Sequence, residues 1–267
     1  MEILIFYALL ATIGTWAVNS LGAATVLFFK SPKEKHLNLM LGFASGVMIA
    51  ASFWSLLEPS IELAEKNGST PSYIPATFGF IFGAVFMWLS DKIVTLSRRR
   101  LIISQATHNE KLNRIIMLVL SITLHNIPEG LAVGVAFGSL QSGNCSVENL
   151  MGAITIAVGI GIQNFPEGAA VSLPLRREGF SRIKCFLIGI SSGFVEPIAG
   201  VIGALAVVHV NTILPYALAF AAGSMILVAV HELIPECQRN QDTHPYFATM
   251  GIVAGFAVMM LLDVMLG

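Results

Sequence analysis

The sequence contains little charge and few cysteines. Only 12% of its 267 residues are Asp, Glu, Lys or Arg, whereas 55% are hydrophobic, and the mean hydropathy is +0.77. This composition excludes an ordinary soluble domain. The three cysteines, Cys145, Cys185 and Cys237, are scattered and form no Cys-x-x-Cys pair. They therefore indicate neither a disulfide framework nor a thiolate metal site.

The N-terminus lacks the basic segment of a signal peptide. Glu2 stands in its place, and the apolar run continues to Phe29, which is too long for the apolar core of a signal peptide. We interpret this run as the first transmembrane helix. Further apolar runs of about 20 residues predict an all-α membrane protein with eight transmembrane helices in one transporter-sized domain, residues 1–267. The expected ranges are 3–29, 37–60, 73–95, 114–140, 149–175, 185–208, 213–235 and 245–265.

Positive charge is nearly absent from every second loop. All Lys and Arg residues except Lys66 lie in or beside the loops after the first, third, fifth and seventh predicted helices. The positive-inside rule then places these loops in the cytosol and both termini outside. The longest cytosolic loop is expected at about residues 96–113. Pairs of glycines four residues apart recur in five predicted helices, which indicates a closely packed bundle.

A repeated motif lies in the fourth and fifth predicted helices. The segments are His125-Asn-Ile-Pro-Glu129-Gly and Gln163-Asn-Phe-Pro-Glu167-Gly. In each copy an imidazole or amide and a carboxylate are four residues apart, on one helical face, with Asn126 or Asn164 beside them. Each proline also leaves a backbone carbonyl without its helical partner. Together these groups form an oxygen and nitrogen set suited to a divalent cation.

The alternative is a structural polar contact between two helices. Two buried carboxylates would repel each other unless a cation lies between them, so the repeat favours a metal site. Glu196, followed by Pro197 in the sixth predicted helix, adds a third carboxylate at the same depth, which suits a bridging ligand of two metals. Ligands without thiolate favour Zn(II), Fe(II), Mn(II), Co(II) or Cd(II) and argue against Cu(I). Two copies in antiparallel helices are also what a 3+2+3 inverted repeat would produce.

The paired motifs, with Glu196-Pro197 in the sixth helix, resemble the ZIP family of divalent-metal transporters, the zinc- and iron-regulated transporter-like proteins. Gln163 at the head of the second motif is similar to the GufA-like branch. The resemblance implies a two-metal centre in which His125, Glu129, Gln163 and Glu167 bind one metal, and Asn126, Asn164 and Glu196 complete the second. It also implies a homodimer and a rigid-body movement of helices 1, 4, 5 and 6 against helices 2, 3, 7 and 8.

Two further groups of residues suggest an entrance and an exit. Met48 and Ser55 resemble family positions that line the entrance, and Ile156 and Ile160 lie outward from Gln163, where they suit an apolar gate. At the cytosolic end of the seventh helix, His231, Glu232 and Glu236 suit an exit site. The alternatives are simple packing for the first group and a solvated helix end for the second.

These observations predict a transporter that imports divalent transition metal, zinc above all, through the cell membrane (the inner membrane in a bacterial source) by alternating access. We expect no enzymatic activity, no cofactor and no nucleic-acid partner. The expected partners are the divalent metal, as transported substrate, and the lipid bilayer in which the protein is embedded. Two alternatives remain: a membrane-embedded metallohydrolase and a passive metal channel. His231-Glu232 superficially resembles the start of a His-Glu-x-x-His motif, but no second His stands four residues after His231, so the hydrolase motif fails.

Overall fold

The protein is built from long helices, and the part of the chain that the structure describes contains no strand. The computed structural model describes residues 2–28, 34–68, 71–104, 110–141, 147–177, 179–209, 213–238 and 246–266. The first helices are α1 (Glu2–Phe28), α2 (Glu34–Ala51), η1 (Ser52–Leu57), α3 (Glu58–Asn67), α4 (Tyr73–Ser104) and α5 (Glu110–Gly138). There follow η2 (Ser139–Gln141), α6 (Val147–Arg177), α7 (Arg182–Gly193), α8 (Val195–His209), α9 (Leu214–Val228), η4 (Ala229–Leu233), α10 (Ile234–Gln238) and α11 (Phe247–Leu266).

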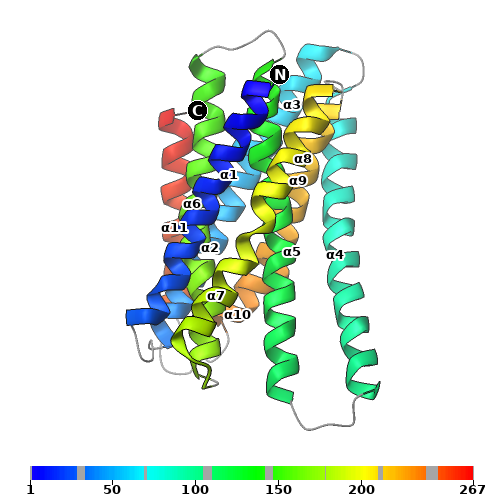
Figure 1. Ribbon diagram of the computed structural model, residues 1–267. Helices are drawn as coiled ribbons and strands as arrows, with labels where there is room; N and C mark the ends of the chain where they lie inside the picture. Colours follow the sequence, from blue (N-terminus) through cyan, green and yellow to red (C-terminus); the bar gives the residue numbers. More distant parts are fainter. Residues whose placement is uncertain are drawn as a thin grey trace.

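The helices run side by side along one long axis (Figure 1), as a multi-pass membrane protein requires. Six of the described helical segments are long and apolar enough to cross a membrane. The helices that carry the paired motifs, α5 and α6, are not among these six. The beginning of α1, the end of α11 and α3 all lie at the same end of the bundle, whereas α10 lies at the opposite end.

Two predicted boundaries change in the structure. The loop expected over 96–113 is shorter, because α4 continues to Ser104 and α5 begins at Glu110; residues 105–109 lie outside the described part. The stretch after Leu96 contains Arg, Leu and Ile without Gly or Pro, so nothing in it ends a helix. The sixth predicted helix is two helices, α7 and α8. The division lies just before Pro197, which has no N–H to donate to the carbonyl of Gly193. At the end of α7, the N–H of Phe194 donates to the carbonyl of Ser191, three residues earlier.

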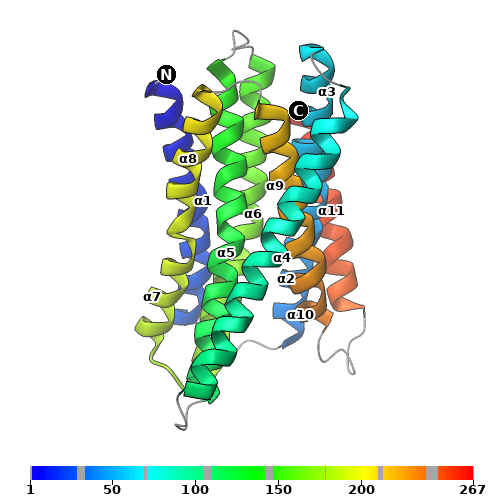
Figure 2. The same cartoon turned by 90° about the vertical axis from the view of Figure 1, so that its right-hand side faces the viewer.

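The helices form two groups, which we call the site bundle and the support bundle. The site bundle contains α1, α5, α6, α7 and α8, in which α1 packs along α6 and α5 packs along α8. The support bundle contains α2, α3, α4, α9, α10 and α11 with η1 and η4, in which α2 packs along α11 and α4 packs along α9. In Figure 2, α1, α7 and α8 lie on one side, α2, α9 and α11 on the other, and α5 and α6 between them.

Glycines bring helix backbones into contact in each bundle, as their spacing predicts. In the site bundle, a Cβ added at Gly134 of α5 would overlap the carbonyl oxygen of Gly200 in α8. In the support bundle, a Cβ added at Gly46 of α2 would overlap the carbonyl oxygen of Ile252 in α11. The helix backbones are therefore in contact at these points. Van der Waals contacts between the backbones, rather than between side chains, hold the helices together there.

The seventh and second spans each contain a π-helical segment just before a proline. Glu58 N–H donates to Phe53 O at the end of η1, and Ile234 N–H donates to Ala229 O at the end of η4. Pro59 and Pro235 follow directly. A proline ring clashes with the carbonyl four residues earlier, and a widened π turn moves that carbonyl aside. In both spans, therefore, the helical register changes in the turn just before the proline.

Candidate metal centre

The seven polar residues singled out in the sequence are all buried. They come from α5, α6 and the first turn of α8, and none is more than 4% exposed: His125, Asn126, Glu129, Gln163, Asn164, Glu167 and Glu196. Pro128 and Pro166 lie inside α5 and α6, which continue through them. The continuous helices place each motif's first and fifth residues one turn apart on the same face.

The three amide side chains use their NH₂ groups to hold protein acceptors. Gln163 Nε2 donates to Glu129 Oε1 at 2.6 Å, and Asn164 Nδ2 donates to Glu196 Oε2 at 2.8 Å. Asn126 Nδ2 donates to the backbone carbonyl of Ser192 at 2.8 Å. Because the nitrogen of each amide is engaged in this way, its oxygen is the atom left to meet a ligand.

Seven buried oxygens of these residues have no hydrogen-bond partner. They are Asn126 Oδ1, Glu129 Oε2, Gln163 Oε1, Asn164 Oδ1, both carboxylate oxygens of Glu167, and Glu196 Oε1. A buried polar atom without a partner costs free energy, about 1–3 kcal/mol for a neutral group and more for a charged one. Such a concentration of unpaired acceptors is what a site for a cation requires, since a cation accepts lone pairs from all of them.

The centre joins carboxylates to amides. Glu129, Glu167 and Glu196 lie close enough to one another to interact electrostatically. Among the described residues, no group of three or more His, Cys, Asp and Glu side chains is arranged to hold a metal ion by itself. A metal ion bound here would therefore also need the unpaired amide oxygens of Asn126, Gln163 and Asn164.

His125 makes its closest polar contact outside this oxygen set. Its Nε2 lies 2.6 Å from Glu232 Oε1, which belongs to η4 of the support bundle. Glu232, expected in an exit site at the helix end, thus contacts a residue expected at the metal centre. The other two residues of the expected exit site lie elsewhere: His231 is exposed, with Nε2 4.0 Å from Asp91 Oδ2, and Glu236 is exposed on α10. Asp91 was not predicted, and no motif in α4 marks it.

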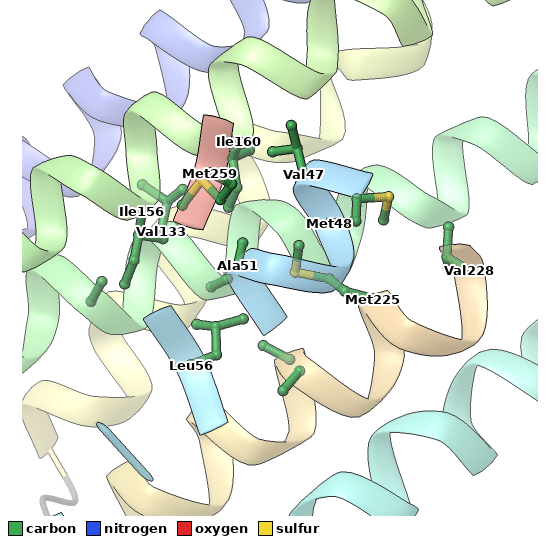
Figure 3. Packing of buried hydrophobic residues seen from close by; sticks show 14 of the residues in the cluster. Val47, Met48, Ala51, Leu56, Val133, Ile156, Ile160, Met225, Val228 and Met259 are labelled. Carbon is green, nitrogen blue, oxygen red and sulfur yellow. The ribbon is translucent and has the colours of Figure 1, made fainter. Parts of the chain in front are cut away.

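The residues expected at the entrance separate into an apolar and a polar group. Met48, Ile156 and Ile160 are buried together with Met225 and Met259 (Figure 3). Ile156 and Ile160 belong to α6 of the site bundle and the three methionines to the support bundle, so this apolar cluster lies between the bundles. Ser55 makes a polar contact instead.

Ser55 Oγ donates to Asp263 Oδ1 at 2.5 Å, and the second oxygen of Asp263 is buried without a partner. Asp263 is on α11, 208 positions away in the chain, and its sequence neighbours are apolar. An acidic residue inside a predicted transmembrane helix was the signal that could have identified it.

Comparison with known proteins places these residues in context. Residues 104–263 match the family described as ZIP Zinc transporter. The chain is 37% identical to the human zinc transporter ZIP11, with 98% of each protein covered. It is 35% identical to the zinc transporter ZIPB of Bordetella bronchiseptica, with 98% of this chain and 82% of that protein covered. It is 33% identical to the zinc transporter GufA of Myxococcus xanthus, with 97% and 98% covered.

Proposed function

The chain belongs to the ZIP family of metal transporters, and from this premise we propose that it carries divalent transition metal, zinc above all, into the cytosol through a two-metal centre. Members of this family are transporters and not enzymes. The observation that carries the proposal is the set of seven buried oxygens without hydrogen-bond partners between α5, α6 and α8. Among the described residues, only two other buried side-chain oxygens lack a hydrogen-bond partner, those of Thr155 and Asp263.

We assign the ligands to two neighbouring positions. Glu129, Gln163 and Glu167, with His125, form the first, and Asn126, Asn164 and Glu196 form the second, with Glu129 and Glu167 shared. The hydrogen bonds support this division, because Gln163 binds Glu129 while Asn164 binds Glu196. Three carboxylates around two divalent ions leave a small net charge. Burying the ions and the carboxylates together therefore costs less free energy than burying either of them alone.

We propose that the site bundle moves against the support bundle to expose the centre to each side in turn. The tight glycine crossings within each bundle support rigid bodies, since backbones in contact cannot slide without separating. The apolar cluster between the bundles suits the closed outer gate; it consists of Met48, Ile156, Ile160, Met225 and Met259. A polar contact between His125 of α5 and Glu232 of η4 also connects the two bundles.

The helix pairs also support a 3+2+3 inverted repeat. A two-fold axis between α5 and α6 would exchange the pair α1 and α6 with the pair α8 and α5, and the pair α2 and α11 with the pair α9 and α4. The π segments before Pro59 and Pro235 fall in the second and seventh spans, which the same axis would exchange. We further propose outside termini, a homodimer and a location in the cell membrane.

The test is metal uptake by the purified protein in liposomes that contain a zinc-sensitive dye. We expect saturable Zn(II) uptake by the unaltered protein and none by Glu167→Ala, because Glu167 offers two unpaired oxygens. Thr155→Val is the control: it removes a buried hydroxyl of α6 that has no partner and belongs to a residue eight positions before Gln163, which is not a proposed ligand. Currents that rise linearly with voltage would instead support a channel, and hydrolysis lost in Glu232→Gln with uptake intact would support an enzyme.

A further inference from the structure

Helix α1 carries none of the motif residues, yet it presents a polar face to the metal centre. Thr12, Thr15 and Asn19 lie three and four residues apart and are each at most 2% exposed. Asn19 Nδ2 donates to the carbonyl of Gly189, and Thr12 Oγ1 donates to the carbonyl of Ala8. Their side chains therefore bond to backbone. The side chain of Thr15 is different, because it reaches a proposed metal ligand.

The Thr15 hydroxyl has two acceptors within reach. Oγ1 lies 2.5 Å from Glu196 Oε2 and 3.0 Å from the carbonyl of Thr12. One hydroxyl proton can serve only one of them at a time. A hydroxyl bonded to a carboxylate makes a short, charge-assisted contact of about 2.5–2.7 Å, about twice as strong as a neutral one. The proton therefore lies on the bond to Glu196.

The backbone of Thr15 also meets a second proposed ligand of the same metal. Asn164 Nδ2 donates to Glu196 Oε2 at 2.8 Å and approaches the carbonyl of Thr15 at 3.4 Å. Glu196 Oε2 thus accepts two donors, while Glu196 Oε1 and Asn164 Oδ1 have none. Gly193 keeps the space beside Oε1 open, because a Cβ there would lie 3.1 Å from Oε1 and 2.7 Å from Asn19 Nδ2.

We propose that Thr15 is a positioning residue of the transport site, which holds Glu196 through Oε2 so that Oε1 alone faces the second metal. The inference rests on the proposed two-metal function. A carboxylate held at one oxygen binds a metal through the other and cannot rotate to bind it through both. Removal of a hydrogen-bond partner of a metal ligand typically weakens metal binding about 10- to 100-fold. α1 thereby becomes part of the site although it supplies no ligand.

Thr15→Val tests the proposal, because valine has the shape of threonine without the hydroxyl. We expect equilibrium dialysis of the purified protein with ⁶⁵Zn(II) to show two zinc ions per chain in the unaltered protein. In Thr15→Val the affinity for one of them should fall at least about tenfold, and the other should be unchanged. Thr15→Ser keeps the hydroxyl and should restore binding. Thr12→Val removes a neighbouring buried hydroxyl of α1 without touching a ligand, and should leave both affinities unchanged.

A second comparison shows whether Thr15 acts through Glu196. In a Glu196→Ala background, Thr15→Val should weaken zinc binding no further. Equal affinities of Thr15→Val and the unaltered protein would overturn the proposal, as would a Thr15→Ser protein as weak as Thr15→Val. If Thr15→Val does not fold, Thr15→Ala serves in the same comparison with Thr15→Ser. Failure of the unaltered protein to bind or transport zinc would overturn the proposed function itself, which is a different result.

Discussion

Single residues of the centre show how amides can prepare a site for a cation. Each amide donates its NH₂ group to a protein acceptor, and each leaves its oxygen without a partner. The hydrogen bonds orient the oxygens before any ion arrives, so that little side-chain entropy remains to be lost on binding. Carboxylates attract any divalent ion, and discrimination between ions must therefore come from the neutral ligands.

Among the proposed neutral ligands, Gln163 is the one for which substitution is most informative. Its Nε2 donates to Glu129 while its oxygen is unpaired. In Gln163→His, one imidazole nitrogen can keep the bond to Glu129 while the other meets the ion, and zinc accepts nitrogen ligands readily. We expect an active protein whose preference shifts toward Zn(II) relative to Mn(II), measured by competitive uptake of paired metals in the same vesicles.

The comparison requires equal amounts of each protein in the vesicles. Glu167→Ala, prepared in parallel, should take up neither metal, because no other side chain replaces its two oxygens. An unchanged order of metals in a fully active Gln163→His protein would show that this position does not set selectivity. The entrance around Met48 and Ser55 would then be the next place to examine.

At the scale of helices, glycines bring the backbones of neighbouring helices into contact. Gly134 touches the backbone of α8, so Gly134→Ala must push α5 and α8 apart. Overpacking of this kind typically costs about 1–3 kcal/mol. We expect a lower midpoint of thermal unfolding in detergent and reduced uptake, since α5 and α8 both carry proposed ligands.

A second glycine of the site bundle provides the matched control. Gly152 lies inside α6, and an added Cβ would meet nothing within 4 Å. Gly152→Ala should therefore leave stability unchanged or raise it by up to about 1 kcal/mol, the difference in helix propensity. If both alanine variants unfold at the same temperature as the unaltered protein, the crossing at Gly134 is not a tight contact.

At the scale of the whole molecule, the orientation in the membrane decides the direction of transport. Glu65 is exposed on α3 and Gln238 is exposed on α10. These two helices lie at opposite ends of the bundle (Figure 1). In a background without the native cysteines, Glu65→Cys should react with a membrane-impermeant maleimide added to intact cells, and Gln238→Cys should react only after lysis. The reverse pattern would place the end of the bundle that carries α3 in the cytosol and the end that carries α10 outside.

The sequence by itself determined what depends on short spacing along the chain. The approximate helix spans follow from the lengths of apolar runs. Six of the seven candidate ligands follow from a motif in which i and i+4 share a helical face, and Glu196 follows from its place before Pro197 in an apolar run. All seven are buried at the places where the spans meet. The break near Glu196 also had a local sign in Pro197, although the sequence predicted one helix where the structure has two.

Only the tertiary structure decided which helix faces meet. Thr15 and Glu196 are 181 positions apart, and His125 and Glu232 are 107 apart. In a soluble protein an apolar stripe marks the buried face of a helix, but lipid tails are as apolar as a protein core, so a membrane helix is apolar all round. Its rotation is set instead by glycine crossings and buried polar contacts with distant helices. For this reason the role of α1 was visible only in three dimensions.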